Sequence, residues 1–223
     1  MKGLLKKDML IIMEQKAIGL ILIICCIAGV IIARGNYDFS VGFIDGYMTI
    51  IGSMTVLTTI SYDESENGMA YIMSMPVSRK MYVNGKYLIA LIVSAGVGLI
   101  LTGMNFIMAV AGEKDVSSGK FMMITFCIIA VSLIISSIGI PAYLKYGAKK
   151  GAAVNIMGIL IIVAVCFLLV KVIENAGFDL ASVVRYMGSP DSYGLSGLVL
   201  TVAAICLIIS YGISQKIMRI KEF

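Results

Sequence analysis

Six stretches of apolar residues, each about as long as a membrane-crossing helix, constrain the fold of this chain more than any other feature. Such a helix needs about 17–25 mostly apolar residues, because the hydrocarbon core of a bilayer is about 30 Å thick. The stretches cover residues 17–33, 41–60, 87–111, 121–143, 152–170 and 195–214. Apolar residues make up 60% of the chain, whereas soluble domains contain about 45–50%. The pattern predicts an all-α integral membrane protein with six transmembrane helices. Since no repeat or low-complexity linker interrupts it, we expect residues 1–223 to form a single transmembrane domain.

The basic residues are distributed unevenly between the two sides that this topology creates. Six spans place both termini on one side, and 13 of the 18 lysines and arginines fall in the segments on that side. Because lysine and arginine are enriched in cytoplasmic loops, we expect a multi-pass protein of the cell membrane with both termini and segment 61–80 in the cytoplasm. The uneven distribution also explains the net charge of +5 without a nucleic-acid partner.

Residues 1–16 precede the first apolar stretch and have the pattern of an amphipathic helix. Leu5, Met9, Ile12 and Met13 share one helical face, and lysines bracket the segment. Such helices lie in the membrane interface with their apolar face toward the lipid, so we expect an interfacial helix on the inner leaflet. A signal peptide is the alternative, but its apolar core would begin late and its candidate cleavage site is poor.

The longest polar interruption in the first half of the chain is segment 61–80. Ser61 and Glu64 have the spacing of a capping box, and carboxylates are favoured near a helix N-terminus. Pro76 would end such a helix. The acidic residues of the segment are Asp63, Glu64 and Glu66. We therefore predict a short cytoplasmic helix that begins near Ser61.

The apolar residues of this predicted helix form a narrow stripe. Met69, Ile72 and Met73 are spaced i, i+3, i+4 and so share one face. A helix with a stripe of this kind docks into a groove on another protein. A solvated loop between two spans is the alternative that the pattern leaves open.

A second short amphipathic segment is predicted on the outer side, between the fifth and sixth spans. Its apolar residues Leu180, Val183, Val184 and Met187 are spaced i, i+3, i+4, i+7, and Asp179 before them fits an N-cap. The segment is too short to cross a membrane. We expect it to lie in the outer interface or to enter the membrane as a re-entrant helix.

The residue types of the chain exclude most catalytic and metal sites. There is no histidine, and all five cysteines lie inside the apolar stretches. These facts remove the commonest general base, the Ser/His and Cys/His nucleophiles, zinc sites and a disulfide framework. The sequence also lacks the Gly-x-x-x-x-Gly-Lys-Ser/Thr loop that binds nucleotide phosphates. We therefore expect this chain to be no enzyme and to hold no cofactor, so that any ATP and Mg²⁺ belong to a partner subunit.

A few polar residues inside the predicted spans are candidates for a transport pathway. They are Asp45, Asn105, Ser132, Ser136 and Asn155. A carboxylate at membrane depth normally faces a cavity or a partner; alternatively, the second span begins after Asp45 and leaves it in water. Because hardly any charge lies at mid-membrane, we expect a wide, weakly polar pathway that suits an amphipathic peptide or a lipid-like molecule.

The topology and one local motif together resemble the type-2 family of ABC exporter permeases. The motif consists of Asp63-Glu64, then Tyr71-Ile72-Met73-Ser74-Met75-Pro76-Val77-Ser78-Arg79-Lys80, then Lys86-Tyr87-Leu88. It is similar to a signature of peptide exporters from Gram-positive bacteria, including the group that exports phenol-soluble modulins. Met75 replaces the leucine that is usual in that signature, a change that a flexible apolar side chain should tolerate.

The resemblance implies that segment 63–75 is a coupling helix, inserted into a cleft of a separate cytoplasmic ABC ATPase that hydrolyses ATP. It also implies a pair of permeases with two ATPases, for which a homodimer is the simplest arrangement. The coupling residues that it implies are Asp63, Glu64, Glu66, Met69, Tyr71, Ile72, Met73, Pro76 and Arg79. The substrate class that it implies is an amphipathic, antimicrobial or toxin-like peptide.

Three other functions fit parts of the pattern. A substrate-binding subunit of an ATP-driven vitamin importer would share the six spans and the ATPase partner, but an acidic coupling segment is not its hallmark. A transporter subunit that gives immunity to a peptide would have the same sequence features as an exporter. A membrane enzyme of the phospholipid-transfer type needs several carboxylates in one inner motif, whereas Asp45-Gly46 stands alone.

Overall fold

The computed structural model describes the chain in several ranges, and every element in them is a helix. The described residues are 2–15, 20, 21, 23, 24, 27, 28, 31, 37–64, 68–74, 77–111, 118–175 and 193–221. The helices are α1 (Lys2–Glu14), α3 (Tyr37–Glu64), α4 (Gly68–Ser74), α5 (Arg79–Ala111), α6 (Ser118–Asn175) and α8 (Tyr193–Ile220). No strand occurs in these ranges. The predicted all-α class is confirmed for this part of the chain.

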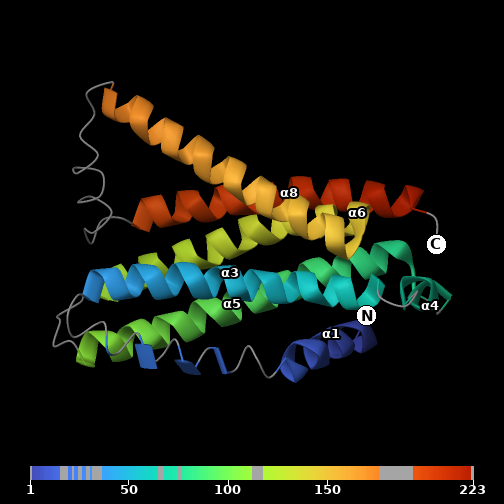
Figure 1. Ribbon diagram of the computed structural model, residues 1–223, viewed down its shortest axis with the longest axis horizontal. Helices are drawn as coiled ribbons and strands as arrows, with labels where there is room; N and C mark the ends of the chain where they lie inside the picture. The colour runs from blue at the N-terminus through green and yellow to red at the C-terminus, as the bar shows by residue number, and fades with distance from the viewer. Residues whose placement is uncertain are drawn as a thin grey trace.

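Helix α6 is a hairpin of two helical limbs. At Gly147 the backbone angles are φ 79° and ψ 175°, and the chain reverses direction there, as Figure 1 shows. This combination of angles is adopted almost only by glycine, because a Cβ would clash with the backbone. Pro141 lies inside the first limb, and the non-helical angles occur at Gly147 rather than at the proline. The reversal of the chain therefore lies at the glycine, a short distance beyond the proline.

Several helices are long and apolar enough to cross a membrane. In the described residues these are Arg79–Ile107, Met123–Ala164 and Gly197–Ile220. The second range contains both limbs of α6, so the three ranges cover four of the predicted spans. Helix α3 covers the predicted span 41–60, and its 28 residues extend over about 42 Å. The predicted span 17–33 and the predicted outer helix near Asp179 fall mostly or wholly outside the described residues, and the number of six spans stays a prediction.

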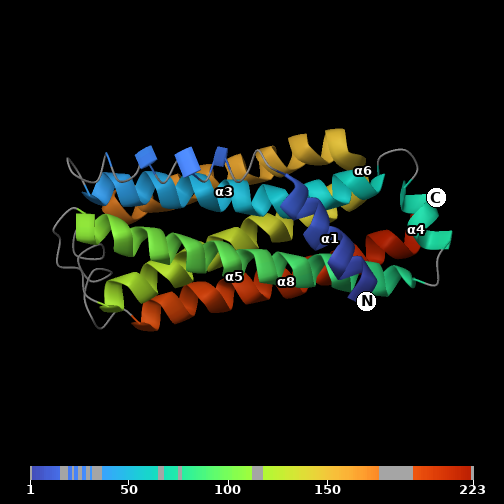
Figure 2. The ribbon, with the colours of Figure 1, turned by 90° about the horizontal axis from the view of Figure 1, so that it is seen from below.

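The segments that the sequence predicts for one side of the membrane lie at one end of the bundle. Both ends of the chain and α4 are found at this end in Figures 1 and 2. The turn of α6 is there too, because the carboxylate of Glu64 at the end of α3 accepts a hydrogen bond from the backbone N–H of Ala148 at 2.6 Å. This agrees with the predicted grouping of these segments; that the end is cytoplasmic stays a prediction.

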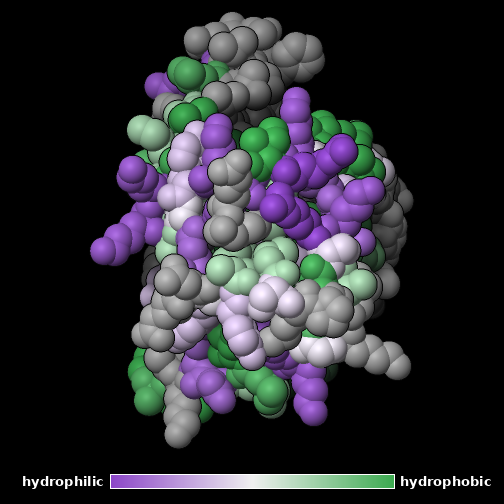
Figure 3. Space-filling view, turned by 90° about the vertical axis from the view of Figure 1, so that its right-hand side faces the viewer, coloured by the Kyte–Doolittle hydropathy of each residue, from purple (hydrophilic) through white to green (hydrophobic). Residues whose placement is uncertain are grey.

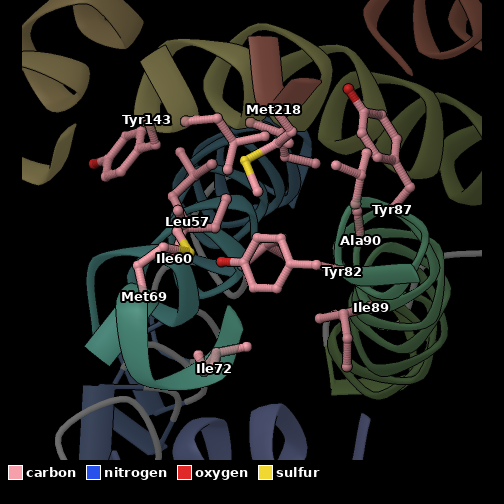
Figure 4. Packing of buried hydrophobic residues seen from close by; sticks show 14 residues of the cluster. Leu57, Ile60, Met69, Ile72, Tyr82, Tyr87, Ile89, Ala90, Tyr143 and Met218 are labelled. Carbon is pink, nitrogen blue, oxygen red and sulfur yellow. The ribbon is translucent and has the colours of Figure 1, made fainter. Parts of the chain in front are cut away.

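The largest apolar core lies at this same end and joins α4 to the long helices. Figure 4 shows Tyr82 of α5 at its centre, beside Ile60 of α3, with Ile72 of α4 on one side and Met218 of α8 on the other. The side chains of Tyr82, Ile60 and Met218 are at most 1% exposed. Burial of each large apolar side chain contributes about 1.5–3 kcal/mol. The core therefore joins α3, α4, α5, α6 and α8 at this end, which forms the base of the bundle.

Close approach of α3 and α6 depends on a glycine. A Cβ at Gly139 would lie 2.6 Å from both terminal methyl carbons of Leu57, far inside van der Waals contact. A larger residue at this position would have to displace the Leu57 side chain, so the glycine favours the close approach of these two helices. The sequence contains Gly139 in the predicted fourth span but gives no sign of its partner, because the contact is between residues remote in the chain.

The predicted capping box at Ser61 is wrong. Helix α3 continues through Ser61 to Glu64, and the Ser61 hydroxyl donates to the carbonyl of Leu57 within that helix at 3.3 Å. The Glu64 carboxylate is engaged by Ala148. The short helix begins instead at Gly68, where a Cβ would lie only 2.9 Å from the backbone oxygen of Asp63. The continued helix is favoured because it places Asp63 against Lys86 and Glu64 against the N–H of Ala148.

Candidate coupling site

Helix α4 presents one face to the protein and another to the outside. Met69 and Ile72 are buried, at 4% and 7% exposure, within the core at the base of the bundle. Met73 is partly buried and packs against the same core. Tyr71 is 66% exposed. Met69 and Ile72 of the predicted apolar stripe are therefore covered by the chain itself, and the outward face is the one that carries Tyr71.

A buried cluster of charges lies directly beside the start of α4 and joins three helices. The Nζ atom of Lys86 on α5 is 2.6 Å from Oδ2 of Asp63 on α3 and 2.9 Å from Oδ2 of Asp8 on α1. The Lys86 side chain is 1% exposed, and the two aspartates are each 3% exposed. Lys7 pairs with Asp63 and lies 3.3 Å from Oδ1 of Asp8. Two cations and two carboxylates thus balance each other.

Two hydroxyl groups complete the cluster. Tyr82 donates to Oδ2 of Asp63 at 2.9 Å, and Lys86 donates to the Thr59 hydroxyl at 3.1 Å. Buried charges are tolerated when they are paired and hydrogen-bonded, whereas loss of one partner leaves an uncompensated charge. These contacts therefore fix α1 against the end of α3 and the beginning of α5, the two helices that flank α4 in the chain.

A second set of polar contacts ties the same region to α6 and α8. Lys221, which follows α8, lies 3.1 Å from Oε1 of Glu64 and donates to the carbonyl of Leu144 at 2.9 Å. Arg79, the first residue of α5, donates to the carbonyls of Met218 and Arg219 at 2.9 Å each. Arginine and lysine near a helix C-terminus satisfy carbonyls that the helix leaves unpaired. The C-terminal end of α8 is thereby held against the helices that flank α4.

These contacts give α4 a mechanical connection to the whole bundle. Figure 3 looks onto the end that carries α4 and shows hydrophilic residues spread across it. The charge cluster joins α1 to α3 and α5, the helices that precede and follow α4, and Glu64 and Arg79 join these two helices to α6 and α8. Packed, polar-bonded elements of this kind move as units rather than deform continuously.

The structure distributes the predicted coupling residues over three helices. Asp63 and Glu64 end α3, residues 69–73 lie on α4, and Arg79 begins α5. Asp63 is buried in the charge cluster, so its carboxylate faces the protein interior. Glu66 and Pro76 lie outside the described residues. Among the described residues of the predicted set, Tyr71 is the large apolar side chain that is exposed, and Arg79 is exposed as well.

Sequence reasoning missed Asp8 and the buried state of Lys86. A signal for Asp8 exists, because Leu4, Asp8 and Ile12 are spaced by four residues and so share one face of α1. Leu4 and Ile12 pack against the core, and Asp8 is therefore turned inward between them. Lys86 stands in the motif Lys86-Tyr87-Leu88 and near other basic residues, but nothing in that pattern indicates that its side chain is buried.

The predicted pathway residues lie in the interior of the bundle. Asp45 and Asn105 meet there: the Asn105 side-chain amide donates to both carboxylate oxygens of Asp45, at 3.1 and 3.0 Å. The second reading of Asp45, a position in water, does not hold, because this residue is only 8% exposed. Asp45 also lines a cavity of about 660 Å³.

The serines and Asn155 occupy other parts of the interior. The hydroxyl of Ser132 bonds those of Ser53 and Ser94, which joins α6 to α3 and α5. Ser136 and Asn155 are fully buried, and their side-chain polar atoms have no hydrogen-bond partner within the described ranges. The structure thus places Asp45 beside a cavity and Ser132 at a contact between three helices. Ser136 and Asn155 lie in the interior, where the described residues supply no hydrogen-bond partner to their side chains.

Comparison with known proteins identifies the family. A search among curated proteins found no match. The family model described as "ABC-2 family transporter protein" matches residues 3–219, which is nearly the whole chain and includes α1, α4 and the C-terminal end of α8. The chain therefore belongs to the ABC-2 family of transporter proteins.

Proposed function

We propose that this chain is the permease subunit of an ATP-driven exporter that moves amphipathic peptides out of the cell. Family membership makes it a membrane permease subunit that works with an ATPase partner. The finer assignment to the Gram-positive peptide exporters is supported by the motif that runs from Asp63 to Leu88. The chain itself hydrolyses no ATP and holds no cofactor in this proposal, because the ATPase subunit binds ATP and Mg²⁺.

The position of α4 is the observation that carries the proposal. One face of this helix is anchored in the core through Met69 and Ile72, and the other presents Tyr71 at the end of the bundle that holds both termini. Such an arrangement suits a helix that receives motion from a partner and passes it to the spans. We propose that α4 inserts into a cleft of the cytoplasmic ATPase, with Tyr71 as the main contact.

The proposed assembly is a homodimer of permeases with two ATPases in the cell membrane, with both termini cytoplasmic. The bundle has large apolar surfaces for lipid and for a second copy: on α5, α6 and α8 the exposed side chains include Leu99, Leu160 and Ile208. Six spans from one chain are few to enclose a peptide pathway, which favours a pair. The weakly polar interior suits an amphipathic peptide rather than an ion.

Replacement of Tyr71 by aspartate is expected to abolish peptide-driven transport while leaving the permease folded. The reason is that a charge placed in an apolar contact costs a few kcal/mol, whereas Tyr71 contributes little to the core because it is 66% exposed. The measurement is ATP-dependent peptide uptake into inside-out vesicles. Tyr71→Phe is the matched control and is expected to transport normally. Transport by Tyr71→Asp at the wild-type rate would show that α4 is not the coupling helix.

The predicted orientation is tested by cysteine labelling. In a variant without the native cysteines, a cysteine at position 67, beside α4, should react with an impermeant maleimide only from the cytoplasm. A cysteine at position 189, between α6 and α8, should react only from outside, because the basic residues concentrate on the other side. Labelling of both positions from one side would overturn the six-span topology.

The vitamin-importer alternative differs from this proposal in what the permease binds by itself. Importer subunits of that kind hold one small polar molecule through a few fixed contacts, whereas the described cavity is lined almost wholly by apolar side chains. We expect no saturable binding of water-soluble vitamins to the isolated permease. Tight binding of one vitamin would establish the importer reading instead.

A further inference from the structure

An apolar groove runs along the bundle between α3 and the two limbs of α6. It has a volume of about 660 Å³ and is partly open on one side. Its walls include Ile50 of α3, Cys127 and Ile134 of the first limb, and Ile162 of the second limb. The lining of the first limb extends from residue 123 to residue 138, which corresponds to about 22 Å of helix. The groove is therefore elongated and apolar, and a single hydrocarbon chain could lie along it.

Asp45 is the charged residue in the lining of this groove. It lies on α3 about 28 Å along the helix axis from Glu64, and so near the end of the bundle remote from α4. Its side chain meets the amide of Asn105, which donates to both carboxylate oxygens. Among the described residues, the carboxylates of Asp8, Asp63 and Glu64 form ion pairs with lysines, and all three lie at the opposite end. A neutral amide is thus the partner that this part of the chain supplies to the carboxylate.

A carboxylate in such surroundings favours a cation. Removing an ionised carboxylate from water costs several kcal/mol, and an amide hydrogen bond offsets only part of this. A positively charged group that enters the groove at Asp45 would recover Coulomb energy in a low-dielectric medium. A neutral molecule gains at most a hydrogen bond from this charge, and an anionic molecule is repelled by it.

We propose that the groove binds a cationic amphiphile, with its hydrocarbon part along α3 and α6 and its ammonium group against Asp45. Asn105 is a positioning residue, because it holds the carboxylate at the polar end of the groove. The apolar walls then select for hydrophobic length, and the carboxylate selects for charge. Isoleucine and methionine walls adapt to chains of differing shape.

This inference deepens the proposed function, because it names the chemical class that the exporter subunit takes from the membrane. Only the role of the bound amphiphile in transport rests on the proposed function. Binding itself requires neither the ATPase nor α4. A binding experiment on the permease alone and a transport experiment on the complex can therefore fail separately.

The experiment uses the full chain in nanodiscs of phosphatidylcholine, with a hexadecyltrimethylammonium probe that carries a photoreactive diazirine on its alkyl chain. Light-dependent labelling should saturate, and mass spectrometry should place the label on residues of the first limb of α6. Asp45→Asn is expected to raise the half-saturating concentration about tenfold or more, which corresponds to about 1.4 kcal/mol. Asp45→Glu retains the charge and should stay within about threefold of the unaltered chain.

Competition separates charge recognition from simple partitioning into lipid. Unlabelled hexadecyltrimethylammonium should displace the probe, whereas hexadecanol and palmitate at the same membrane concentration should not. Equal displacement by hexadecanol, or unchanged labelling of the Asp45→Asn variant, would overturn the proposal. Either result would mean that the groove is filled by any alkyl chain and that the carboxylate does not choose its occupant.

A second pair of variants tests the groove without touching the carboxylate. Gly46 lines the groove, and a Cβ built there meets nothing within 4 Å, so Gly46→Leu adds a side chain to open space. Gly103 on α5 is equally open but lies outside the groove. Gly46→Leu should reduce labelling about tenfold, and Gly103→Leu should leave it unchanged. Equal labelling of the two variants would show that the amphiphile binds elsewhere.

Discussion

Replacing Lys86 with methionine is expected to lower the free energy of unfolding by about 3–5 kcal/mol. Lys86 is 1% exposed and contacts two carboxylates that are each 3% exposed. Without it, Lys7 alone must balance Asp8 and Asp63, and one buried carboxylate stays uncompensated. The loss is measured by equilibrium unfolding in mixed detergent micelles. Because the cluster joins α1, α3 and α5, the variant should also release α1 from the bundle and make it susceptible to proteolysis.

Two further variants show whether charge balance is the cause. Lys80→Met removes an exposed lysine of the same helix and should change stability by less than about 0.5 kcal/mol. Asp8→Leu combined with Lys86→Met removes one charge of each sign and should recover roughly half of the lost stability. If the double variant loses as much free energy of unfolding as the two single variants lose together, the charges do not act as a balanced unit.

Replacement of Gly147 by valine should destabilise the protein by about 3 kcal/mol or more. Two independent causes contribute to this loss of stability. The angles φ 79° and ψ 175° are almost exclusive to glycine, and a Cβ there would lie 2.9 Å from Oε2 of Glu64. The added side chain would push Glu64 away from the Ala148 N–H and from Lys221. We expect a lower unfolding temperature together with loss of ATP-driven transport.

The matched control for this change is Gly103→Val, at a helical glycine where a Cβ meets nothing within 4 Å. Glycine in a helix interior is less favourable than most residues by up to about 1 kcal/mol, so this control should be neutral or slightly stabilising. If both variants unfold at the same temperature, the turn at Gly147 does not limit the stability of the bundle.

The parts of the fold that depend on hydrophobic length could be predicted from the sequence. Apolar stretches of span length give helices at the predicted places, since both limbs of α6, α5 and α8 cover four of the predicted spans. The grouping of the termini, α4 and the α6 turn at one end also follows, because an even number of crossings and the basic residues both demand it. Family membership is consistent with the resemblance of the motif around α4.

The parts that depend on contacts between distant residues could not be predicted. Ser61 and Glu64 satisfy a local capping rule, yet Glu64 bonds Ala148 and Lys221, and no local rule foresees partners so far along the chain. Met69 and Ile72 have the spacing of a docking stripe, but the same spacing serves equally for packing on Tyr82. Hydrophobic periodicity states which face is apolar and leaves open what covers it.

The central claim is that the exposed face of α4 contacts a separate ABC ATPase, and cross-linking from position 71 tests it most directly. A photoreactive phenylalanine analogue replaces Tyr71 in cells that express the whole transporter, and the same analogue replaces Leu99, which is also well exposed at 71% but lies on α5 away from α4. We expect cross-links from position 71 to an ABC ATPase, identified by mass spectrometry, and none from position 99. Absence of an ATPase cross-link from position 71, or equal cross-linking from both positions, would contradict the claim.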